Sequence, residues 1–287
     1  MRAADLLAGR ARLVGLTRRA DDVAKLRSHG VVPVVGDLDA LRTLERLRFS
    51  PDAVMHFAPP QAEGRGDLRT GRLIAALSAA RRIPRRFVYI STSGVYGDCA
   101  GARIDETRPR RAVSARAKRR VDAEDRLRSW AAHRGVALSI VRAPGIYAET
   151  RLPLERLKQG TPALVAEQDV YTNHIHADDL ARVAVAALFR GRANRAYHAS
   201  DDAELRMGEW FDAVADAHGL PRPPRVSADE AERRIAPALW SFMSESRRLS
   251  NRRMKRELRV TLRYATPQAM LAGTAPRAMR RQIPLTF

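Results

Sequence analysis

The sequence predicts an α/β fold built on a doubly wound parallel sheet. Segments with the pattern of buried strands alternate with segments of helical periodicity through the first 200 residues, at a spacing that suits repeated βα units. From residue 201 onward this rhythm gives way to helices broken by prolines. We therefore expect a sheet domain over residues 1–200, with residues 151–173 inserted on its ligand side, and a smaller, mostly helical subdomain over residues 201–287.

The first half of the chain supplies most of the predicted sheet. Short β-branched runs end in Gly36-Asp37 and before Pro59-Pro60, which are turn residues that stop strands. The expected strands are 13–17, 31–35, 53–57 and 87–90. The expected helices are 2–9, 21–28, 40–47 and one whose apolar face is Leu68, Leu73, Ile74 and Leu77.

The second half continues the pattern with longer elements. A polar loop over 98–114 leads into a helix that ends near His133, and a strand over 136–141 follows it. Asp178 and Asp179 are suited to cap the next helix, because carboxylates accept hydrogen bonds from free amides at a helix N-terminus. That helix runs to Gly191, and residues 196–198 form the last predicted strand.

Charge and composition narrow the classes of function. The chain carries a net charge of +20, yet only four of its 52 Lys and Arg residues are lysines and the arginines are spread along its length. Only residues 247–259 form a dense basic stretch, which is either an anion site or a solvated helix face. Nucleic acid is an unlikely partner, because aromatics are not interleaved with these charges. No membrane-length apolar run or signal peptide is present, and Cys99 is the one cysteine, so we expect a cytoplasmic protein.

The most informative segment runs from Phe87 to Gly97. Four residues suited to a buried strand end abruptly in Ser91, Thr92 and Ser93. Ligands bind outside the carboxyl ends of parallel strands, so these hydroxyls are candidates for a site. The turn over 144–147 follows another strand and is expected at the same edge.

In this order the segments resemble the extended and atypical branch of the short-chain dehydrogenase/reductase superfamily, the NAD-dependent epimerase/dehydratase-like proteins with a Rossmann-type sheet. The motifs that carry the resemblance are Gly15-Leu16-Thr17-Arg18-Arg19, Gly36-Asp37-Leu38, His56-Phe57-Ala58, Ser91-Thr92-Ser93-Gly94-Val95-Tyr96-Gly97, His174-Ile175-His176-Ala177-Asp178-Asp179-Leu180-Ala181 and Ser244-Glu245-Ser246-Arg247-Arg248. Each motif alone is weak, whereas the set in this order is specific.

The resemblance implies a dinucleotide cofactor, NADP or NAD. Arg18 and Arg19 would lie at the adenosine ribose, where a guanidinium can pair with a 2′-phosphate, and this favours NADP slightly. The cofactor-binding set that the resemblance implies is Thr17, Arg18, Arg19, Asp37, Leu38, Ala58, Ser91, Pro144, Gly145 and Ile146.

The N-terminus departs from the family pattern. The family has a first strand followed by a Gly-x-x-Gly-x-x-Gly turn that cradles the pyrophosphate, and neither is present in this sequence. The missing strand is the one that lies at the centre of a doubly wound sheet. We therefore expect that Met1 is an internal codon and that the natural start lies upstream.

Catalysis departs from the pattern as well. The family's usual proton shuttle is Tyr-x-x-x-Lys, and here Ser114 replaces the tyrosine while Lys118 is retained. The predicted catalytic residues are Thr92, which holds the substrate or nicotinamide, Lys118, and Tyr96 as the replacement proton shuttle, with His174 and His176 as reserves. The predicted substrate-binding residues are Ser93, Tyr147, His174, Arg247 and Arg248.

Other chemistries fit less well. His174 and His176 would share one face of a strand while the following aspartates begin a helix, so no metal site is expected. A hydrolase is disfavoured because the Gly-x-Ser-x-Gly pattern is absent. The expected function is an NAD(P)-binding oxidoreductase or epimerase acting on a small polar or anionic molecule. The oligomeric state is left open, and a homodimer is one of the alternatives. The rival hypothesis is a catalytically degenerate dinucleotide-binding sensor or scaffold.

Overall fold

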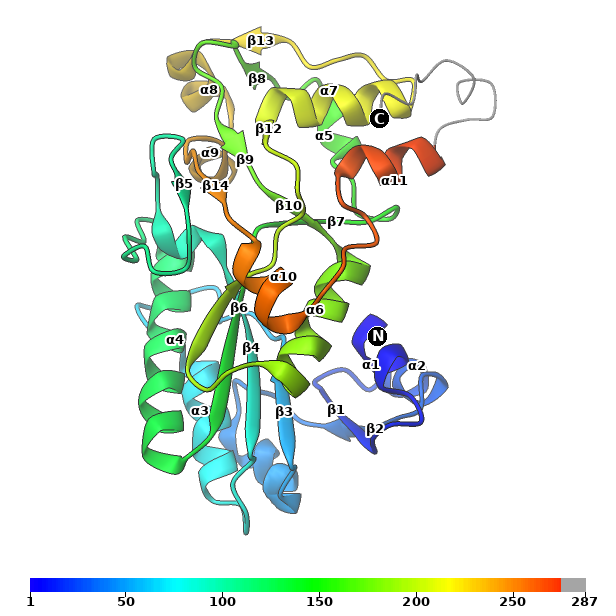
Figure 1. Ribbon diagram of the computed structural model, residues 1–287, viewed down its shortest axis with the longest axis vertical. Helices are drawn as coiled ribbons and strands as arrows, with labels where there is room; N and C mark the ends of the chain where they lie inside the picture. Colours follow the sequence, from blue (N-terminus) through cyan, green and yellow to red (C-terminus); the bar gives the residue numbers. More distant parts are fainter. Residues whose placement is uncertain (275–287) are drawn as a thin grey trace.

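The computed structural model describes residues 1–274 of the chain. Its main sheet has four parallel strands in the order β11-β6-β4-β3 (Figure 1). These strands are β3 (Ala53–His56), β4 (Arg86–Thr92), β6 (Ala137–Ala143) and β11 (Arg195–His198). The predicted α/β class with a parallel sheet is confirmed.

A separate pair of parallel strands lies beside this sheet. β1 (Leu13–Thr17) pairs with β2 (Val31–Val35), and the two form a sheet of their own. Leu16 and Val34 from the pair pack into the same apolar core as α3 (Leu68–Ser78). Within the described residues the sheet is therefore interrupted between β1 and β3. We expect the missing central strand at this position.

Helices cover both faces of the four-stranded sheet (Figure 1). Phe87 and Tyr89 of β4 pack on one side with α3 and α4 (Ala115–Arg134). The alternate residues Val88 and Ile90 pack on the other side with α6 (Ala177–Arg190) and α10 (Arg252–Leu258). This alternation follows from the two-residue period of a strand, and it makes β4 a fully buried central strand.

The observed elements match most of the predicted ones, with two differences. The helices α1 (Arg2–Leu7) and α2 (Asp22–Ser28) form as expected, whereas η1 (Leu41–Phe49) is a 3₁₀ helix. At α6 the capping side chain is His176, whose Nδ1 accepts from the amide of Asp178 at 3.2 Å. Asp179 instead accepts from the amides of Arg263 and Tyr264, so it fixes the C-terminal segment against α6.

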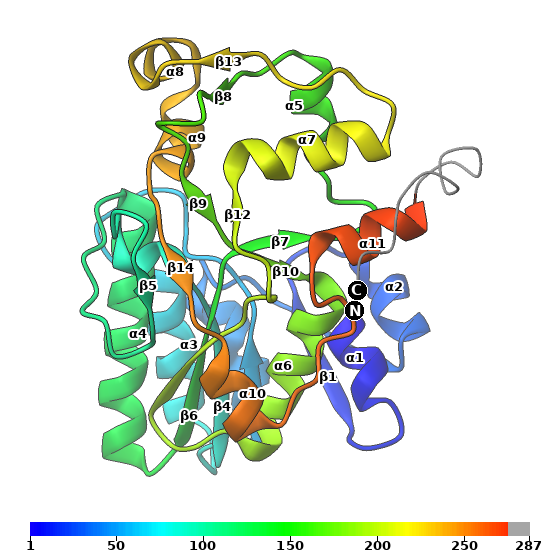
Figure 2. The same ribbon diagram turned by 45° about the horizontal axis from the view of Figure 1, so that its top comes forward.

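The upper subdomain combines two stretches of chain (Figure 2). Residues 151–173 join it, because β9 (Tyr171–Thr172) pairs with β12 (Leu205–Arg206) and β8 (Ala163–Leu164) pairs with β13 (Arg225–Val226). The other elements of this part are α5 (Leu154–Lys158), α7 (Met207–Ala217), α8 (Ala228–Arg234), α9 (Pro237–Met243) and α11 (Pro267–Thr274). The paired strands β7 (Gly145–Tyr147) and β10 (His174–His176) lie between this part and the sheet domain.

The predicted boundary at residue 201 needs a correction. After α9 the chain returns to the sheet domain, where β14 (Arg248–Leu249) pairs with β5 (Arg103–Ile104). Met254 and Leu258 of α10 are buried in the core beneath α6. Residues 248–258 therefore belong structurally to the sheet domain, and residues 275–287 lie outside the described part of the chain. No helix among residues 1–274 has the length and hydropathy that a membrane crossing needs.

Candidate functional site

The carboxyl ends of β4 and β6 lie next to each other at one end of the sheet, which we call the sheet edge. Thr92 is paired in register with Ala143, and the chain continues from Ala143 into Pro144 and Gly145. After Thr92 a short 3₁₀ turn, η2 (Ser93–Tyr96), redirects the chain. Gly97 ends that turn with φ of 65°, and a Cβ there would lie 2.4 Å from a backbone oxygen, so only glycine fits. The two strand ends that the sequence placed together are adjacent.

Gly94 lies between Thr92 and the first turn of α4. A Cβ built on Gly94 would be 3.6 Å from Thr92 Oγ1 and 3.8 Å from Ala117 Cβ, so the turn that follows β4 reaches the start of the helix. Thr92 Oγ1 accepts from the amide of Gly94 at 3.2 Å. Within residues 1–274 its own proton has no acceptor, which leaves the half-buried hydroxyl free to donate.

Ser114 and Lys118 begin the same helix. Ser114 is the N-cap, and its Oγ accepts from the amide of Ala117 at 3.3 Å. Lys118, one turn later, is exposed and has no ion-pair partner in the described part of the chain. The serine therefore has a structural role in this helix, while the ammonium group of Lys118 is available.

A cavity of about 280 Å³ opens beside this edge, between the sheet domain and the upper subdomain. Gly145, Ile146 and His174 line it from below, and Trp210 of α7 and Phe242 of α9 line it from above. Arg116 of α4 stacks on Phe242 at 5.1 Å, so the helix that carries Lys118 reaches the rim. The lining is mainly aromatic and aliphatic.

Arg156 is the unusual member of this lining. Its guanidinium stacks on Phe211 at 4.6 Å and donates to the Sδ of Met243 at 3.5 Å. Its Nε is buried without a hydrogen-bond partner, and among the described residues no carboxylate pairs with it. Burial lowers its pKa. A cation in an apolar cavity without a protein counter-ion is suited to an anionic ligand. Sequence reasoning missed Arg156, because nothing in the sequence distinguishes it from the other arginines.

Tyr96 is not positioned as a proton shuttle. Its side chain is 1% exposed, and its hydroxyl binds Nη1 of Arg142 and Nε2 of His198, both at 2.6 Å. Burial raises the pKa of Tyr96 to about 12, although the charge of Arg142 opposes this. A shuttle needs an accessible group with a pKa nearer neutrality, so the geometry makes Tyr96 a buried anchor.

Ser91 and Ser93 also point into the interior. Ser91 is buried, and its Oγ donates to Glu124 of α4 at 2.6 Å. Ser93 is buried in η2. Neither hydroxyl is exposed at the sheet edge, so of the three consecutive hydroxyls only Thr92 remains available to a ligand.

The residues expected at the adenosine end and the middle of the cofactor follow the ends of their strands. Arg18 and Arg19 are exposed after β1, and the hydroxyl of Thr17 binds the amide of Arg19 at 3.2 Å. Asp37 and Leu38 follow β2 and are half-buried, as is Ala58 after β3. At the other end, Pro144, Gly145 and Ile146 follow β6 and are half-buried.

Tyr147 and His174 form a buried aromatic cluster behind the cavity. His174 lies 4.6 Å from the ring of Trp210 and 6.2 Å from that of Tyr147. Burial lowers the pKa of His174 to about 3, which keeps it neutral. The sequence did not identify Asp201, which joins this cluster and whose pKa burial raises to about 8.

Arg247 and Arg248 are engaged within the protein. Arg247 is buried, pairs with Glu245 at 2.8 Å and donates to the carbonyl of Gly97 at 2.6 Å. Arg248 stacks on Tyr171 at 4.7 Å and donates to the carbonyl of Gly101 at 2.8 Å. The prediction that these guanidinium groups meet substrate charge is not supported, since their hydrogen bonds join β14 to the loop after η2.

The fold recurs in solved structures. A functionally unknown conserved protein from Silicibacter pomeroyi DSS is 28% identical with a TM-score of 0.76, covering 95% of this chain and 93% of its own. The dTDP-glucose 4,6-dehydratase DesIV from Streptomyces venezuelae, with NAD and DAU bound, is 19% identical with a TM-score of 0.72, covering 98% and 93%. UDP-glucose 4-epimerase from Thermotoga maritima, with UDP-glucose, is 15% identical with a TM-score of 0.75, covering 95% and 92%.

Sequence comparison gives the family. No curated protein matches the chain. The model of the NAD dependent epimerase/dehydratase family matches residues 3–200, which span the strands β1, β3, β4, β6 and β11 and the edge that carries Thr92. Because this match covers more than half of the chain and agrees with the parallel sheet, the chain belongs to the NAD dependent epimerase/dehydratase family.

Proposed function

We propose that this protein is an NAD(P)-dependent oxidoreductase or epimerase whose substrate is a small molecule with an apolar body and an anionic group. The observation that carries the proposal is the cavity that begins at Gly145, just beyond the end of β6, and combines aromatic walls with Arg156, a cation without a carboxylate partner among the described residues. The family's dependence on NAD supports the cofactor. Under this proposal the cavity binds the substrate between the sheet edge and the upper subdomain.

The side chains present suit the two ends of a dinucleotide. Arg18 has no ion-pair partner among the described residues, so its guanidinium is free to bind a ribose phosphate. Thr92 offers a free hydroxyl proton at the other end, next to the turn at Pro144 and Gly145. This donor set supports an NAD(P) site, and the arginines after β1 favour NADP over NAD.

The cavity favours an amphipathic substrate. Trp210, Phe211 and Met243 offer apolar surface that a flat or aliphatic body would cover. Arg156 would bind a carboxylate or phosphate, and the aromatic wall would strengthen that bond by excluding water. Two of the three neighbours named above were solved with bound molecules, DesIV with NAD and DAU and the epimerase with UDP-glucose. An apolar cavity of about 280 Å³ is better suited to a smaller, less polar molecule.

Thr92 and Lys118 are the protein side chains that would take part in the reaction. When bound, the nicotinamide supplies or accepts the hydride. Thr92 would donate a hydrogen bond to the substrate oxygen, and the ammonium group of Lys118 would stabilise negative charge that develops there. Without a tyrosine at position 114 the final proton would come from Lys118 or from water, and we expect slow turnover.

The rival proposal is a dinucleotide-binding sensor without catalysis. The observation in its favour is the pair of hydroxyls with structural roles: Ser114 caps α4, and Tyr96 is bound to Arg142 and His198. A sensor would bind cofactor with the same residues and turn over no substrate.

Cofactor binding to the full chain separates these possibilities. NADPH and NADH are titrated by fluorescence against the wild type, Arg18→Gln/Arg19→Gln and a charge-matched control, Arg81→Gln/Arg233→Gln. We expect NADPH affinity to fall about tenfold in the first variant only. Absence of binding at millimolar cofactor would overturn the dinucleotide proposal itself.

Turnover is then measured by NADPH oxidation. The panel contains an aromatic 2-oxo acid, the matching neutral ketone and a nucleotide sugar with an oxidised ring. We expect the aromatic acid to be preferred and Thr92→Val to lower its kcat/KM. Cofactor binding with no turnover of any panel member would favour the sensor.

A further inference from the structure

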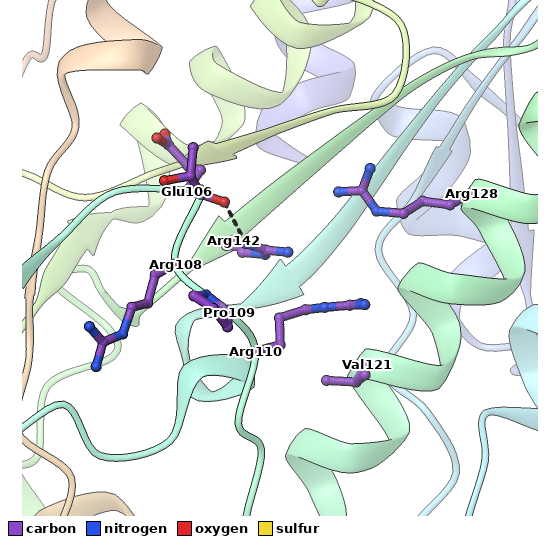
Figure 3. A pocket seen from close by; sticks show the side chains of 8 residues that line it. Glu106, Arg108, Pro109, Arg110, Val121, Arg128 and Arg142 are labelled. Carbon is purple, nitrogen blue, oxygen red and sulfur yellow. Dashed lines mark hydrogen bonds between the residues drawn. The ribbon is translucent and has the colours of Figure 1, made fainter.

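A second cavity, of about 410 Å³, lies between the loop that follows β5, helix α4 and strand β6 (Figure 3). Half of the residues that line it are arginines. The loop contributes Arg108 and Arg110, the helix contributes Arg128, and the strand contributes Arg142. Apart from Val121 and Pro109 its lining is polar or charged. We name this cavity, with these four arginines, the arginine pocket.

Carboxylates within the protein neutralise only part of this charge. Glu124 binds both Arg142, at 2.7 Å, and Arg110, at 3.3 Å. Asp125 binds Arg110 a second time, at 2.7 Å. Two carboxylates are thus shared by two of the four guanidinium groups.

Glu106, the one carboxylate among the residues that line the pocket, binds other partners. Its Oε1 accepts from the amide of His198 at 2.9 Å, and its Oε2 lies 3.3 Å from Arg253. Only its backbone carbonyl faces Arg142, at 3.4 Å, the contact drawn in Figure 3. The carboxylate of Glu106 therefore pairs with Arg253 and not with any of the four arginines of the pocket.

Arg128 and Arg108 have no carboxylate partner in the described part of the chain. Arg128 donates to the carbonyl and the side-chain oxygen of Asn194, at 2.9 and 2.7 Å, and both acceptors are neutral. Burial lowers the pKa of Arg128, and the charges of Arg142 and Arg110 act in the same direction, while those of Glu124 and Asp125 oppose them. An anion in the pocket would relieve that repulsion.

The arrangement of the side chains fits a multivalent oxyanion. Figure 3 shows Arg128 reaching from the helix toward Arg110 and Arg142, while Arg108 points toward the other side of the loop. Guanidinium groups form paired hydrogen bonds with phosphate oxygens, and several of them around one cavity favour a phosphate over a neutral ligand.

We propose that the arginine pocket binds a small phosphate-bearing anion, with Arg128 as its main ligand and Arg108 at the rim. This site shares no lining residue with the cavity around Trp210 and does not depend on the dinucleotide proposal. Inorganic phosphate and pyrophosphate share the chemistry that the pocket would recognise, and they differ in length.

The test is isothermal titration of the full chain with each of these two anions, at an ionic strength held constant with chloride. Three variants each lose two positive charges: Arg108→Gln/Arg128→Gln in the pocket, Arg18→Gln/Arg19→Gln after β1, and Arg81→Gln/Arg233→Gln elsewhere on the surface. We expect saturable binding to the wild type with a Kd below millimolar. We expect a loss of at least tenfold in the pocket variant only. Tighter binding of pyrophosphate would identify a diphosphate group as the ligand, and equal binding a single phosphate.

Three results would overturn the proposal. Equal weakening in all three variants would mean nonspecific attraction to a basic protein. Weakening confined to Arg18→Gln/Arg19→Gln would place the anion after β1. Binding that does not saturate would exclude a defined site. Arg108→Glu, at an exposed side chain without an ion-pair partner in the described residues, keeps the test valid if the double variant folds poorly, and we expect it to weaken binding severalfold.

Discussion

Glu124 and Arg142 form a buried, bidentate ion pair between α4 and β6. The guanidinium Nε donates to Oε1 at 3.0 Å and Nη2 donates to Oε2 at 2.7 Å. The Glu124 side chain has no exposed surface and that of Arg142 is 4% exposed. Burial alone would raise the pKa of Glu124, but its bonds to Arg142 outweigh burial and hold that pKa below its usual range. The pair joins the helix that begins at Ser114 to the strand that ends beside Thr92.

Glu124→Leu is expected to destabilise the fold by about 3–5 kcal/mol, because it leaves the charge of Arg142 buried without a counter-ion. The measurement is urea denaturation near neutral pH. Glu230→Leu is the matched control, since Glu230 pairs with Arg234 at the surface and such pairs contribute about 1 kcal/mol or less. Adding Arg142→Met to Glu124→Leu should recover part of the loss. Equal losses of unfolding free energy in the two single variants would show that the buried pair stabilises the fold no more than the surface pair does.

Tyr96→Phe is expected to lower the free energy of unfolding by about 1–3 kcal/mol, because Arg142 and His198 each lose a buried partner. Under the proposed function it leaves the pH dependence of kcat/KM unchanged, since a buried phenol with a pKa near 12 carries no catalytic proton. The measurements are urea denaturation and NADPH oxidation from pH 6 to 9. A stable variant that loses one limb of the pH profile would restore Tyr96 as the shuttle.

Ser114→Tyr tests whether the lost tyrosine limits catalysis. The serine side chain caps α4, so its removal should cost about 1 kcal/mol of stability. Under the proposed function the new phenol, one turn before Lys118, raises turnover at least tenfold because a general acid–base group typically contributes 10²–10⁴-fold. Ser114→Phe, with the same ring and no hydroxyl, is the control. Equal rates in the two variants would contradict this view of position 114.

The sequence predicted the sheet well because buried parallel strands leave a strong pattern. The segments over 13–17 and 31–35 formed as expected, and Thr92 lies at the sheet edge where the motif placed it. It could not predict which of three adjacent hydroxyls would face outward, because that depends on Glu124 of a distant helix binding Ser91.

The arginines show the same limit more clearly. Arg247 is buried and paired, whereas Arg156 lines a cavity and has no carboxylate partner among residues 1–274, and no local pattern separates the two. Which group an arginine pairs with depends on tertiary packing. In a chain rich in arginine, the sequence alone therefore does not identify the arginines that bind a ligand. The capping role of His176 was missed for a related reason, because the acidic residues that follow it are the more common cap.

Arg156→Met is expected to leave the free energy of unfolding unchanged or raise it slightly, because it removes a partly desolvated charge that has no carboxylate partner in the described residues. The proposed function predicts that KM for an aromatic 2-oxo acid rises at least tenfold while KM for the neutral ketone changes little. Steady-state kinetics and urea denaturation measure the two effects. A variant that is destabilised and equally active on both substrates would make Arg156 a structural residue only.

Asp201→Asn is expected to change how stability depends on pH. Burial raises the pKa of Asp201 to about 8 in the folded protein, from 3.8 as the ordinary value. Between these values the folded state holds a proton that the unfolded state has lost, so the contribution is fully present below about pH 4 and is lost as pH rises through about 8. The free energy of unfolding of the wild type should therefore fall relative to that of Asp201→Asn by up to about 1.4 kcal/mol per pH unit over this window. Urea denaturation from pH 4.5 to 9 measures the difference, with Asp229→Asn on the exposed surface of α8 as the control. Parallel curves for the wild type and Asp201→Asn would show that Asp201 ionises normally, and the cluster behind the cavity would then carry a negative charge that repels the anionic end of the proposed substrate.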